Sequence, residues 1–283
     1  MTDNSEGTAF CALTMCDVRH AMCALRTAIC EHALFLCLLL LLVSCSPADR
    51  LDRILESGVL RVGMDASYPP FEYVDGEGNL VGFDVDLGRE LATRLGVEAR
   101  FVANLSYDGL YDALTADVVD VVISALYVDP ARMADFAYSH SYFNAGQVLV
   151  VRADTSGVGG MADLTGRTVA VEWGSEGDVV ARQWSRRLAR LTVSPCQTAE
   201  EALMRVVSGE ADAAVVDHLS ALQAIGKGEP LRIVGEMLTD EPYAIAVRRE
   251  DGALLRAING LLVAMEEDGT LPRLREKWLG GNQ

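Results

Sequence analysis

The chain has 283 residues, of which 50% are apolar and 23% are charged. It is long enough to bury a full core and too long for one minimal domain, so we expect one or two globular domains and exclude a disordered chain. Acidic side chains outnumber basic ones by 41 to 24, which gives a formal net charge of -17. Because phosphate contacts need a basic face, this charge argues against a nucleic-acid-binding protein.

An apolar run near the N-terminus predicts a signal peptide over residues 1–44. Residues 33–43 are eleven consecutive apolar residues, whereas a helix needs about 20 to cross a hydrocarbon core. Arg19 and Arg26 precede the run, and Cys45 follows it behind a serine. This arrangement resembles a bacterial lipobox, which implies that Cys45 is acylated and anchors the exported chain to the membrane. A plain secretory signal and an uncleaved anchor are the alternatives.

The seven cysteines do not predict a disulfide framework. Five lie in the first 40 residues: Cys11, Cys16, Cys23, Cys30 and Cys37. If Cys45 carries lipid, Cys196 is the only thiol left in the exported chain, so no intramolecular disulfide can form. We therefore expect the apolar core alone to hold the exported chain together.

Strand and helix patterns alternate from Leu51 onward, which is typical of α/β folds. The first block predicts strands at 59–64, 99–103 and 118–124, a hairpin over 71–81, a helix capped by Asp84 and ending at Gly96, and a helix over 107–116. The second block predicts strands at 168–172, 191–194 and 211–216, with helices over 176–188 and 198–207. A strand at 243–247 and helices over 254–265 and 271–278 complete the pattern. Two α/β units of similar size are implied.

Polar residues directly after the predicted strands form a candidate binding site, because open parallel sheets bind ligands at the carboxyl ends of their strands. They are Asp65, Tyr68, Ser124, Arg132, Gly174, Ser175, Glu176 and Asp217. A guanidinium can hold an α-carboxylate by two charge-assisted hydrogen bonds, and free N–H groups at a helix start can take it from the other side. An aspartate would take the α-ammonium, so the set matches a zwitterionic amino acid.

Each of these residues also has a structural interpretation. Asp129 can cap a helix with Pro130 in its first turn, so Arg132 could be a solvated first-turn arginine. Asp217 could merely cap the helix that follows it. The turn at Gly174 could be an ordinary strand-to-helix loop.

Several motifs, in order along the chain, are similar to those of bacterial extracellular solute-binding proteins of family 3, the substrate receptors of polar amino-acid ABC importers. They are LRVGMDASYPPF at 60–71, VGFDVDL at 81–87, DVVIS at 120–124 with Pro130 and Arg132, GEADA at 209–213 with Asp217, and DGTL at 268–271 with Lys277 and Trp278. The resemblance covers essentially the whole chain from Leu51 to Gly280.

The resemblance implies a two-lobed periplasmic-binding-protein fold of type II. Each lobe would be a central, mostly parallel sheet flanked by helices, and a two-strand hinge would join the lobes. Residues 45–146 with 243–283 would form lobe 1, and residues 147–242 would form lobe 2.

The resemblance also implies how the charged ends of the ligand are held. Arg132 would bind the α-carboxylate, with the backbone N–H groups of Ser175 and Glu176 opposite it. Asp217 and the Ser124 carbonyl would hold the α-ammonium.

The side chain of the ligand would contact the aromatic residues of lobe 1. Tyr68 and Tyr107 match an aromatic pair that encloses the ligand side chain, although Tyr107 could equally be a core residue. Asp65 matches a polar position near the end of that side chain. Ala125 and Tyr127 complete the predicted ligand-binding set.

Three positions depart from the family pattern, which usually has Ser or Thr there: Tyr127, Asp129 and Glu176. The Glu176 carboxylate would repel an anionic ligand, and Asp65 adds a second negative charge. This favours a cationic or neutral polar side chain over that of glutamate or aspartate, while polyamines and opines stay possible.

The implied function is the extracytoplasmic binding component of an ABC importer that closes on an amino acid by hinge motion. The expected partners are a membrane permease and a separate ATPase, since the chain has no P-loop motif. We expect a lipid-anchored monomer in the periplasm or on the outer cell surface, with no cofactor, metal or nucleic acid.

Two alternatives share this fold. One is a periplasmic cyclohexadienyl or arogenate-type dehydratase, although His140 and His218 lie in no recognisable triad or metal-ligand spacing. The other is a sensory ligand-binding protein that acts through a partner.

Overall fold

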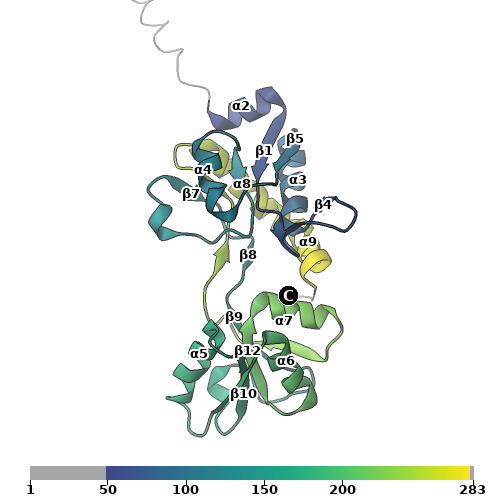
Figure 1. The fold of residues 1–283 in the computed structure, drawn as a ribbon, viewed down its shortest axis with the longest axis vertical. Coiled ribbons are helices and arrows are strands. Elements are labelled where there is room, and N and C mark those ends of the chain that lie inside the picture. The colour runs from purple at the N-terminus through teal and green to yellow at the C-terminus, as the bar shows by residue number, and fades with distance from the viewer. Residues whose placement is uncertain (1–48, 281–283) are drawn as a thin grey trace, which may run out of the picture. The chain divides into compact units, whose positions relative to one another are not determined.

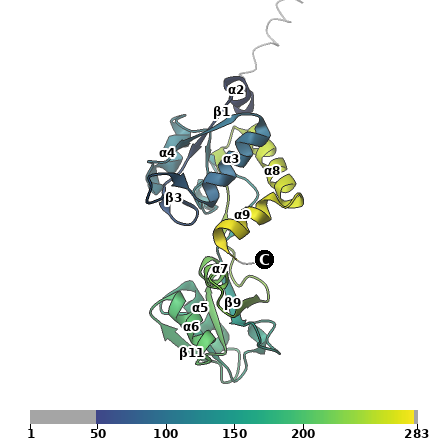
Figure 2. The ribbon, with the colours of Figure 1, turned by 90° about the vertical axis from the view of Figure 1, so that its right-hand side faces the viewer.

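Two five-stranded sheets organise residues 49–280, the residues that the computed structural model describes (Figures 1 and 2). The predicted signal peptide and Cys45 lie outside the described residues. Strands and helices alternate along the chain, as the sequence predicts. In residues 49–280 no helix combines the length and the apolar character that crossing a bilayer requires.

The first sheet is mixed: four of its strands run in one direction, and the fourth in spatial order runs in the opposite direction. In spatial order its strands are β5 (Glu98–Val102), β1 (Val59–Gly63), β6 (Val121–Val122), β15 (Ala246–Arg248) and β7 (Phe136–Tyr138). β1 pairs in parallel with β5 and β6, whereas β15 runs antiparallel to both of its neighbours. A three-stranded ribbon, β2 (Ser67–Tyr68), β3 (Glu72–Val74) and β4 (Leu80–Val81), follows β1.

Helices with one apolar face cover this sheet. They are α2 (Arg50–Ser57), α3 (Phe83–Leu95), α4 (Leu110–Thr115), α8 (Gly252–Glu267) and α9 (Thr270–Leu279), with the 3-10 turns η1 (Tyr107–Gly109) and η2 (Pro130–Arg132). In α3, Phe83, Leu87 and Leu91 repeat every fourth residue and are buried against the sheet. Gly96, in the left-handed conformation, ends the helix as predicted.

The second sheet is buried on both faces. Its strands are β11 (Thr192–Cys196), β10 (Thr168–Glu172), β12 (Ala213–Asp217), β9 (Gln147–Arg152) and β13 (Leu231–Val234). The flanking elements are α5 (Glu176–Ser185), α6 (Ala199–Ser208), α7 (His218–Gly226) and η3 (Met161–Asp163). Successive residues of β12 enter two separate apolar clusters, which explains why the strand is apolar throughout.

The chain passes between the two sheets twice. On the way from β7 to β9 it forms β8 (Phe143–Asn144), and on the way from β13 to β15 it forms β14 (Pro242–Tyr243). These two short strands pair antiparallel, with Tyr243 opposite Phe143. The strand predicted at 243–247 is therefore divided between β14 and β15.

Asp84 does not cap α3, contrary to the sequence prediction. Gly82 is the N-cap, at a φ of 133°, and a Cβ there would lie 2.1 Å from the carbonyl oxygen of Phe71. The helix therefore begins two residues earlier than expected, and the Asp84 carboxylate is fully buried.

The strand predicted at 118–124 is also shorter than expected. The N–H groups of Val118 and Val119 both donate to the carbonyl of Ala113, at 3.0 and 3.4 Å, so they close the end of α4. At the other end Ala125 adopts a φ of 43° and turns the chain out of the sheet.

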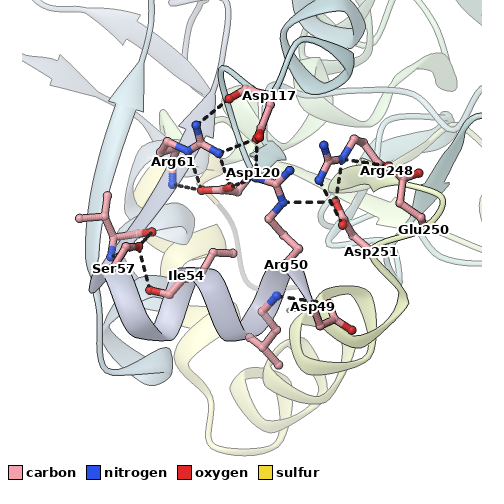
Figure 3. A network of polar contacts seen from close by, with 12 residues as sticks. Asp49, Arg50, Ile54, Ser57, Arg61, Asp117, Asp120, Arg248, Glu250 and Asp251 are labelled. Atoms are coloured by element: carbon pink, nitrogen blue, oxygen red, sulfur yellow. Dashed lines mark hydrogen bonds and ion pairs between the residues drawn. The ribbon is translucent and has the colours of Figure 1, made fainter. Parts of the chain in front are cut away.

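A buried ion network fastens α2 to the first sheet (Figure 3). Arg50 is only 3% exposed, and its Nη1 lies 2.9 Å from Oδ1 of Asp120, while Asp117 and Asp251 also face it. Arg61, from β1, donates to the same Asp120 carboxylate at 2.7 Å. Because a buried charge is costly without a partner, the helix and the sheet depend on each other here.

We expect Asp120→Ala to lower the free energy of unfolding by about 3–5 kcal/mol, because it leaves the buried Arg50 guanidinium short of a partner. Urea unfolding followed by tryptophan fluorescence measures this. The matched control is Asp154→Ala, which breaks the exposed pair with Arg152 and should leave stability almost unchanged. Equal losses in both variants would contradict the assignment.

Candidate functional site

The loops that follow β1, β5 and β6 are bound to each other by hydrogen bonds of Asp65 and Ser124. The Asp65 N–H donates to Ser124 Oγ at 3.0 Å, and the Asp65 carboxylate accepts the N–H of Tyr107 at 3.0 Å. The sequence placed Asp65 and Ser124 in the site because each follows a predicted strand, and the family resemblance placed Tyr107 there. The structure brings them together, at the carboxyl ends of parallel strands.

Ala125 is held in a conformation that L-residues rarely adopt. Its φ is 43°, and its N–H donates to Oδ2 of the buried Asp84 at 2.6 Å. The neighbouring Ser124 hydroxyl donates to Glu72 Oε1 at 2.8 Å. Left-handed backbone costs a non-glycine residue about 1–2 kcal/mol, so these bonds offset a local strain.

Three predicted site tyrosines on this side are not core residues. Tyr68, Tyr107 and Tyr127 are 43%, 44% and 43% exposed, so the core interpretation of Tyr107 does not hold. The Tyr68 ring stacks on Phe71 with 5.7 Å between centroids. Tyr127 packs edge-on to Tyr243, whose hydroxyl donates to the Tyr127 hydroxyl at 3.3 Å. The rings are thus fixed at one edge and open at the other.

Arg132 is half-exposed and makes no hydrogen bond through its guanidinium to another described residue. Its Cζ lies 4.3 Å from the ring centre of Tyr111, and its Nε lies 3.5 Å from Asp129 Oδ2. Asp129 caps η2 by accepting the N–H of Ala131 at 2.9 Å, with Pro130 in the first turn, as the structural interpretation supposed. A cation–π contact and the ion pair with Asp129 therefore support the guanidinium, and its two Nη groups have no acceptor among the described residues.

On the second sheet, the start of α5 offers free backbone donors. Ser175 is the N-cap, and its Oγ accepts the N–H of Asp178 at 3.2 Å. Its own N–H donates to the Glu172 carbonyl at 3.2 Å, so one of the two predicted anion donors is already engaged. Among the described residues, the N–H groups of Glu176 and Gly177 have no hydrogen-bond acceptor. They can serve a carboxylate, because unpaired N–H groups at a helix start attract anions.

The turn before α5 requires a glycine. Gly174 has a φ of 78°, and its N–H donates to Asp178 Oδ2 at 3.2 Å. The predicted turn therefore places residue 174 in the left-handed conformation that glycine adopts without strain.

Asp217 caps α7, as its structural interpretation supposed. Its Oδ1 accepts the N–H of Ser220 at 2.8 Å. The carboxylate is only partly buried, and its other oxygen makes no hydrogen bond with a described residue. Capping therefore occupies one oxygen and leaves the second for an ammonium.

Sequence reasoning missed two residues near Asp217. Gln147 lies directly opposite it in the β9–β12 register and is 6% exposed, and its Oε1 has no hydrogen-bond partner among the described residues. That oxygen would lie 2.8 Å from a Cβ placed on Gly177, so it borders the start of α5. Nothing in the sequence marked it, because β9, whose first residue it is, is not among the predicted strands.

The second missed residue is Glu241. Burial first, then hydrogen bonding and the charge of Glu176, and then the charge of Asp217 raise the pKa of Glu241 to about 7. Three carboxyl groups from separate segments are thus close together on this side. No local pattern marks Glu241, because its partners are far away in the sequence.

The predicted site residues fall into two groups. The first group lies around the first sheet: Asp65, Tyr68, Tyr107, Ser124, Ala125, Tyr127 and Arg132. The second lies around the second sheet: Gly174, Ser175, Glu176 and Asp217. No hydrogen bond or ion pair links Arg132 to Asp217. The charges of Glu241 and Asp217 add to burial in raising the pKa of Tyr127, so their fields reach this tyrosine.

The histidine next to Asp217 is satisfied within the protein. His218 Nδ1 lies 2.8 Å from the Asn144 carbonyl, and the ring stacks on Phe143. Burial lowers the pKa of His218. Between residues 49 and 280 no group of three or more His, Cys, Asp or Glu side chains is arranged to hold a metal ion.

The family of bacterial extracellular solute-binding proteins, family 3, matches residues 60–281. The chain belongs to this family. As a family 3 solute-binding protein it has the two-lobed fold that the sequence predicts, with one sheet in each lobe. The family's members are extracellular or periplasmic proteins.

Individual relatives show the range of this family. The L-cystine-binding protein of Escherichia coli strain K12 is 33% identical over 234 residues, which is 82% of this chain and 86% of that protein. An ancestral cyclohexadienyl dehydratase has a TM-score of 0.72 at 31% identity, covering 83% of this chain and 98% of its own. An ancestral cationic amino acid solute binding protein has a TM-score of 0.60 at 35% identity, covering 81% and 99%.

Proposed function

We propose that this protein is the extracytoplasmic binding component of an ABC importer for a polar L-amino acid. The observation that supports this most is the division of charge between the lobes. One lobe offers the free guanidinium of Arg132, and the other offers the free N–H groups of α5 beside Asp217. A zwitterion satisfies both, because its carboxylate takes donors and its ammonium takes acceptors.

The mechanism we propose is closure of two lobes around the ligand. Lobe 1 comprises residues 45–146 and 243–283, lobe 2 comprises residues 147–242, and β8 with β14 connects them. The carboxylate would be held from opposite lobes by Arg132 and the N–H groups of α5. The ammonium would be held by the Ser124 carbonyl and Asp217, so only the closed state gives each end all of its contacts. The ligand therefore has its highest affinity for the closed state and shifts the population toward it.

The preferred ligand, in this proposal, has a cationic or neutral polar side chain. Arg132 is the only basic residue of the predicted site, whereas Asp65, Glu176, Glu241 and Asp217 are acidic. A second negative charge on the ligand would lack a partner and would face this field. The relatives that bind L-cystine and cationic amino acids agree with such a preference.

We further propose that Cys45 carries lipid and tethers the exported chain to the outer face of a membrane, where it works as a monomer. The amino acid would then be released to a permease whose ATPase is a separate chain. Metabolic labelling with a radioactive fatty acid tests the anchor, since Cys45→Ser should abolish the label.

Arg132→Ala should abolish amino-acid binding. The substitution removes a bidentate charge pair from a closed cleft, which costs about 2–5 kcal/mol and lowers affinity by more than about 20-fold. Isothermal titration calorimetry measures the change. Arg89→Ala, which removes an exposed arginine on α3, is the matched control and should bind like the wild type. Unchanged affinity in Arg132→Ala would refute the carboxylate assignment.

A thermal-shift screen against all L-amino acids, polyamines and dipeptides identifies the ligand. A ligand present at 100 times its Kd should stabilise the folded state by about 2.7 kcal/mol. Lysine, arginine, ornithine or neutral polar compounds should raise the melting temperature. Selective stabilisation by glutamate or aspartate would contradict the charge argument.

The affinity for a cationic ligand should rise between about pH 6 and pH 8. In this range Glu241, whose pKa is raised to about 7, loses its proton and gains the charge that attracts a cation. Glu241→Gln should remove that rise, and the exposed Glu210→Gln should keep it. A pH profile that is the same in Glu241→Gln and the wild type would exclude Glu241 from the site.

A dehydratase is the second candidate, because the ancestral dehydratase is a close structural match. Incubation with prephenate and arogenate separates the two functions. Product formed over many turnovers would establish an enzyme, whereas stoichiometric binding without product supports a receptor. A sensory protein would bind without transport, so uptake of the labelled ligand by cells lacking the gene tests that alternative.

A further inference from the structure

Two carboxyl groups are buried directly beneath the Ser124–Ala125 turn. Glu72 in β3 is 1% exposed, and Asp84 in α3 is 0% exposed. Ser124 Oγ donates to Glu72 Oε1 at 2.8 Å. Asp84 Oδ2 accepts the N–H of Ala125 at 2.6 Å and the hydroxyl of Tyr142 at 2.9 Å. Each carboxyl group thus uses one oxygen to hold a neighbouring segment.

The other oxygen of each group has no partner. Within residues 49–280, Glu72 Oε2 and Asp84 Oδ1 are both buried without a hydrogen bond, and neither residue forms an ion pair with a Lys or Arg. An ionised carboxylate that is buried without a cation is strongly disfavoured, and two of them side by side are more so. If the two groups share one proton, only one negative charge is buried, and the two carboxylates no longer repel each other.

The hydrogen bonds and charges around Glu72 and Asp84 determine which of the two is protonated. Asp84 receives two hydrogen bonds, which favour its charged form, whereas Glu72 receives one and also lies near the charge of Asp65. Burial and the charge of Asp84 raise the pKa of Glu72 far above its usual range. The remaining titratable neighbours are Tyr107 and Tyr142, and neither supplies a positive charge.

We propose that Glu72 and Asp84 share one proton, and that this pair positions the Ser124–Ala125 turn for ligand binding. Glu72 Oε2–H donates to Asp84 Oδ1, which accounts for both unpartnered oxygens with a single bond. Asp84 stays ionised and holds Ala125 by a charge-assisted hydrogen bond. The role in ligand binding rests on the proposed function, whereas the shared proton does not.

The turn matters because it carries the Ser124 carbonyl, which we assign to the α-ammonium. The Ser124 hydroxyl is fixed from two sides, since it donates to Glu72 and accepts the N–H of Asp65. Ala125 would relax out of its left-handed conformation without the bond to Asp84. Loss of the shared proton places two negative charges together and loosens the whole turn.

The sign of the pH dependence follows from the raised pKa of Glu72. A carboxyl group whose pKa is higher in the folded than in the unfolded chain binds more protons when folded. Its contribution to stability is complete below the unfolded value of about 4.3 and is lost as pH rises through the folded pKa. Stability should therefore fall as pH rises above neutrality, whereas ligand affinity should be lost only as pH approaches the folded pKa of Glu72, which burial and the charge of Asp84 raise to about 11.

The test compares Glu72→Gln with Glu72→Met. The glutamine amide can donate to Asp84 Oδ1 in place of the proton, and its oxygen can still accept from Ser124. Methionine has a similar length but neither donates nor accepts. We expect Glu72→Met to weaken amino-acid binding by at least about 10-fold, the cost of a buried polar group left unpaired, and Glu72→Gln to recover most of that loss. Glu77→Gln, an exposed change on the same hairpin, is the control.

Urea unfolding between about pH 6 and pH 9, without ligand, tests the proton itself. The wild type should lose stability over this range, and Glu72→Gln should lose distinctly less, because it has no proton to release. Infrared difference spectra should show a protonated carboxylic acid at pH 8 that disappears in Glu72→Gln.

Two results would overturn the proposal. One is Glu72→Gln binding as weakly as Glu72→Met, which would mean that the site needs an ionised Glu72. The other is a wild-type unfolding profile that coincides with that of Glu72→Gln. If the wild type binds no amino acid at all, the proposed function fails instead, and the unfolding and infrared measurements still decide the shared proton.

Discussion

The hydrogen bond from the Ala125 N–H to the buried Asp84 carboxylate is the interaction on which the first lobe's half of the site depends. It joins the turn after β6 to the first turn of α3, two segments that are 41 residues apart in the sequence. The bond exists because Gly82 lets α3 start early, which turns Asp84 inward instead of leaving it at the helix end. A residue with a Cβ at position 82 would collide with the Phe71 carbonyl, so the helix start and the binding turn are fixed together.

In the second lobe, a glycine allows the corresponding helix start to lie close to the sheet. A Cβ on Gly177 would lie 2.7 Å from the Val215 carbonyl and 2.8 Å from Gln147 Oε1, so only glycine lets α5 begin this close to β12. The close approach places the free N–H groups of α5 beside Asp217. The positive N-terminal end of α5 and the Asp217 carboxylate therefore lie at the ends of neighbouring strands, as is general for ligand sites of parallel sheets.

The sequence predicted those parts of the fold that local chemistry controls. Apolar periodicity identified α3 and the buried strands. The helix predicted from residue 198 does begin there, with the Thr198 side chain accepting the N–H of Glu201. The position of residues after strands, with the family resemblance, also identified the candidate site. All of these features depend on a few adjacent residues, so a single sequence contains enough information.

The predictions failed where a distant partner decides the outcome. Asp84 has the sequence context of a helix cap, but Tyr142 and Ala125 compete for its carboxylate and Gly82 takes the capping position. Glu241 lies in a segment that crosses between the sheets and Gln147 lies at the start of β9, and nothing local marks either as a functional side chain. Their surroundings come from residues that only the folded chain brings near.

The buried carboxyl group of Glu72 and the half-buried one of Glu241 have different consequences for binding and for catalysis. The Glu72 proton lies beneath the site at 1% exposure, so it can position a turn but cannot reach a ligand. Glu241 lies near Glu176 and Asp217 in the proposed site, and its pKa is raised to about 7, so near neutral pH it is present both as an acid and as a base. A dehydratase would need the acid form to protonate a leaving hydroxyl, whereas a receptor for cations needs the charged form. A bound cation stabilises the charged form and lowers the pKa of Glu241, so a cationic ligand removes the proton that dehydration would require.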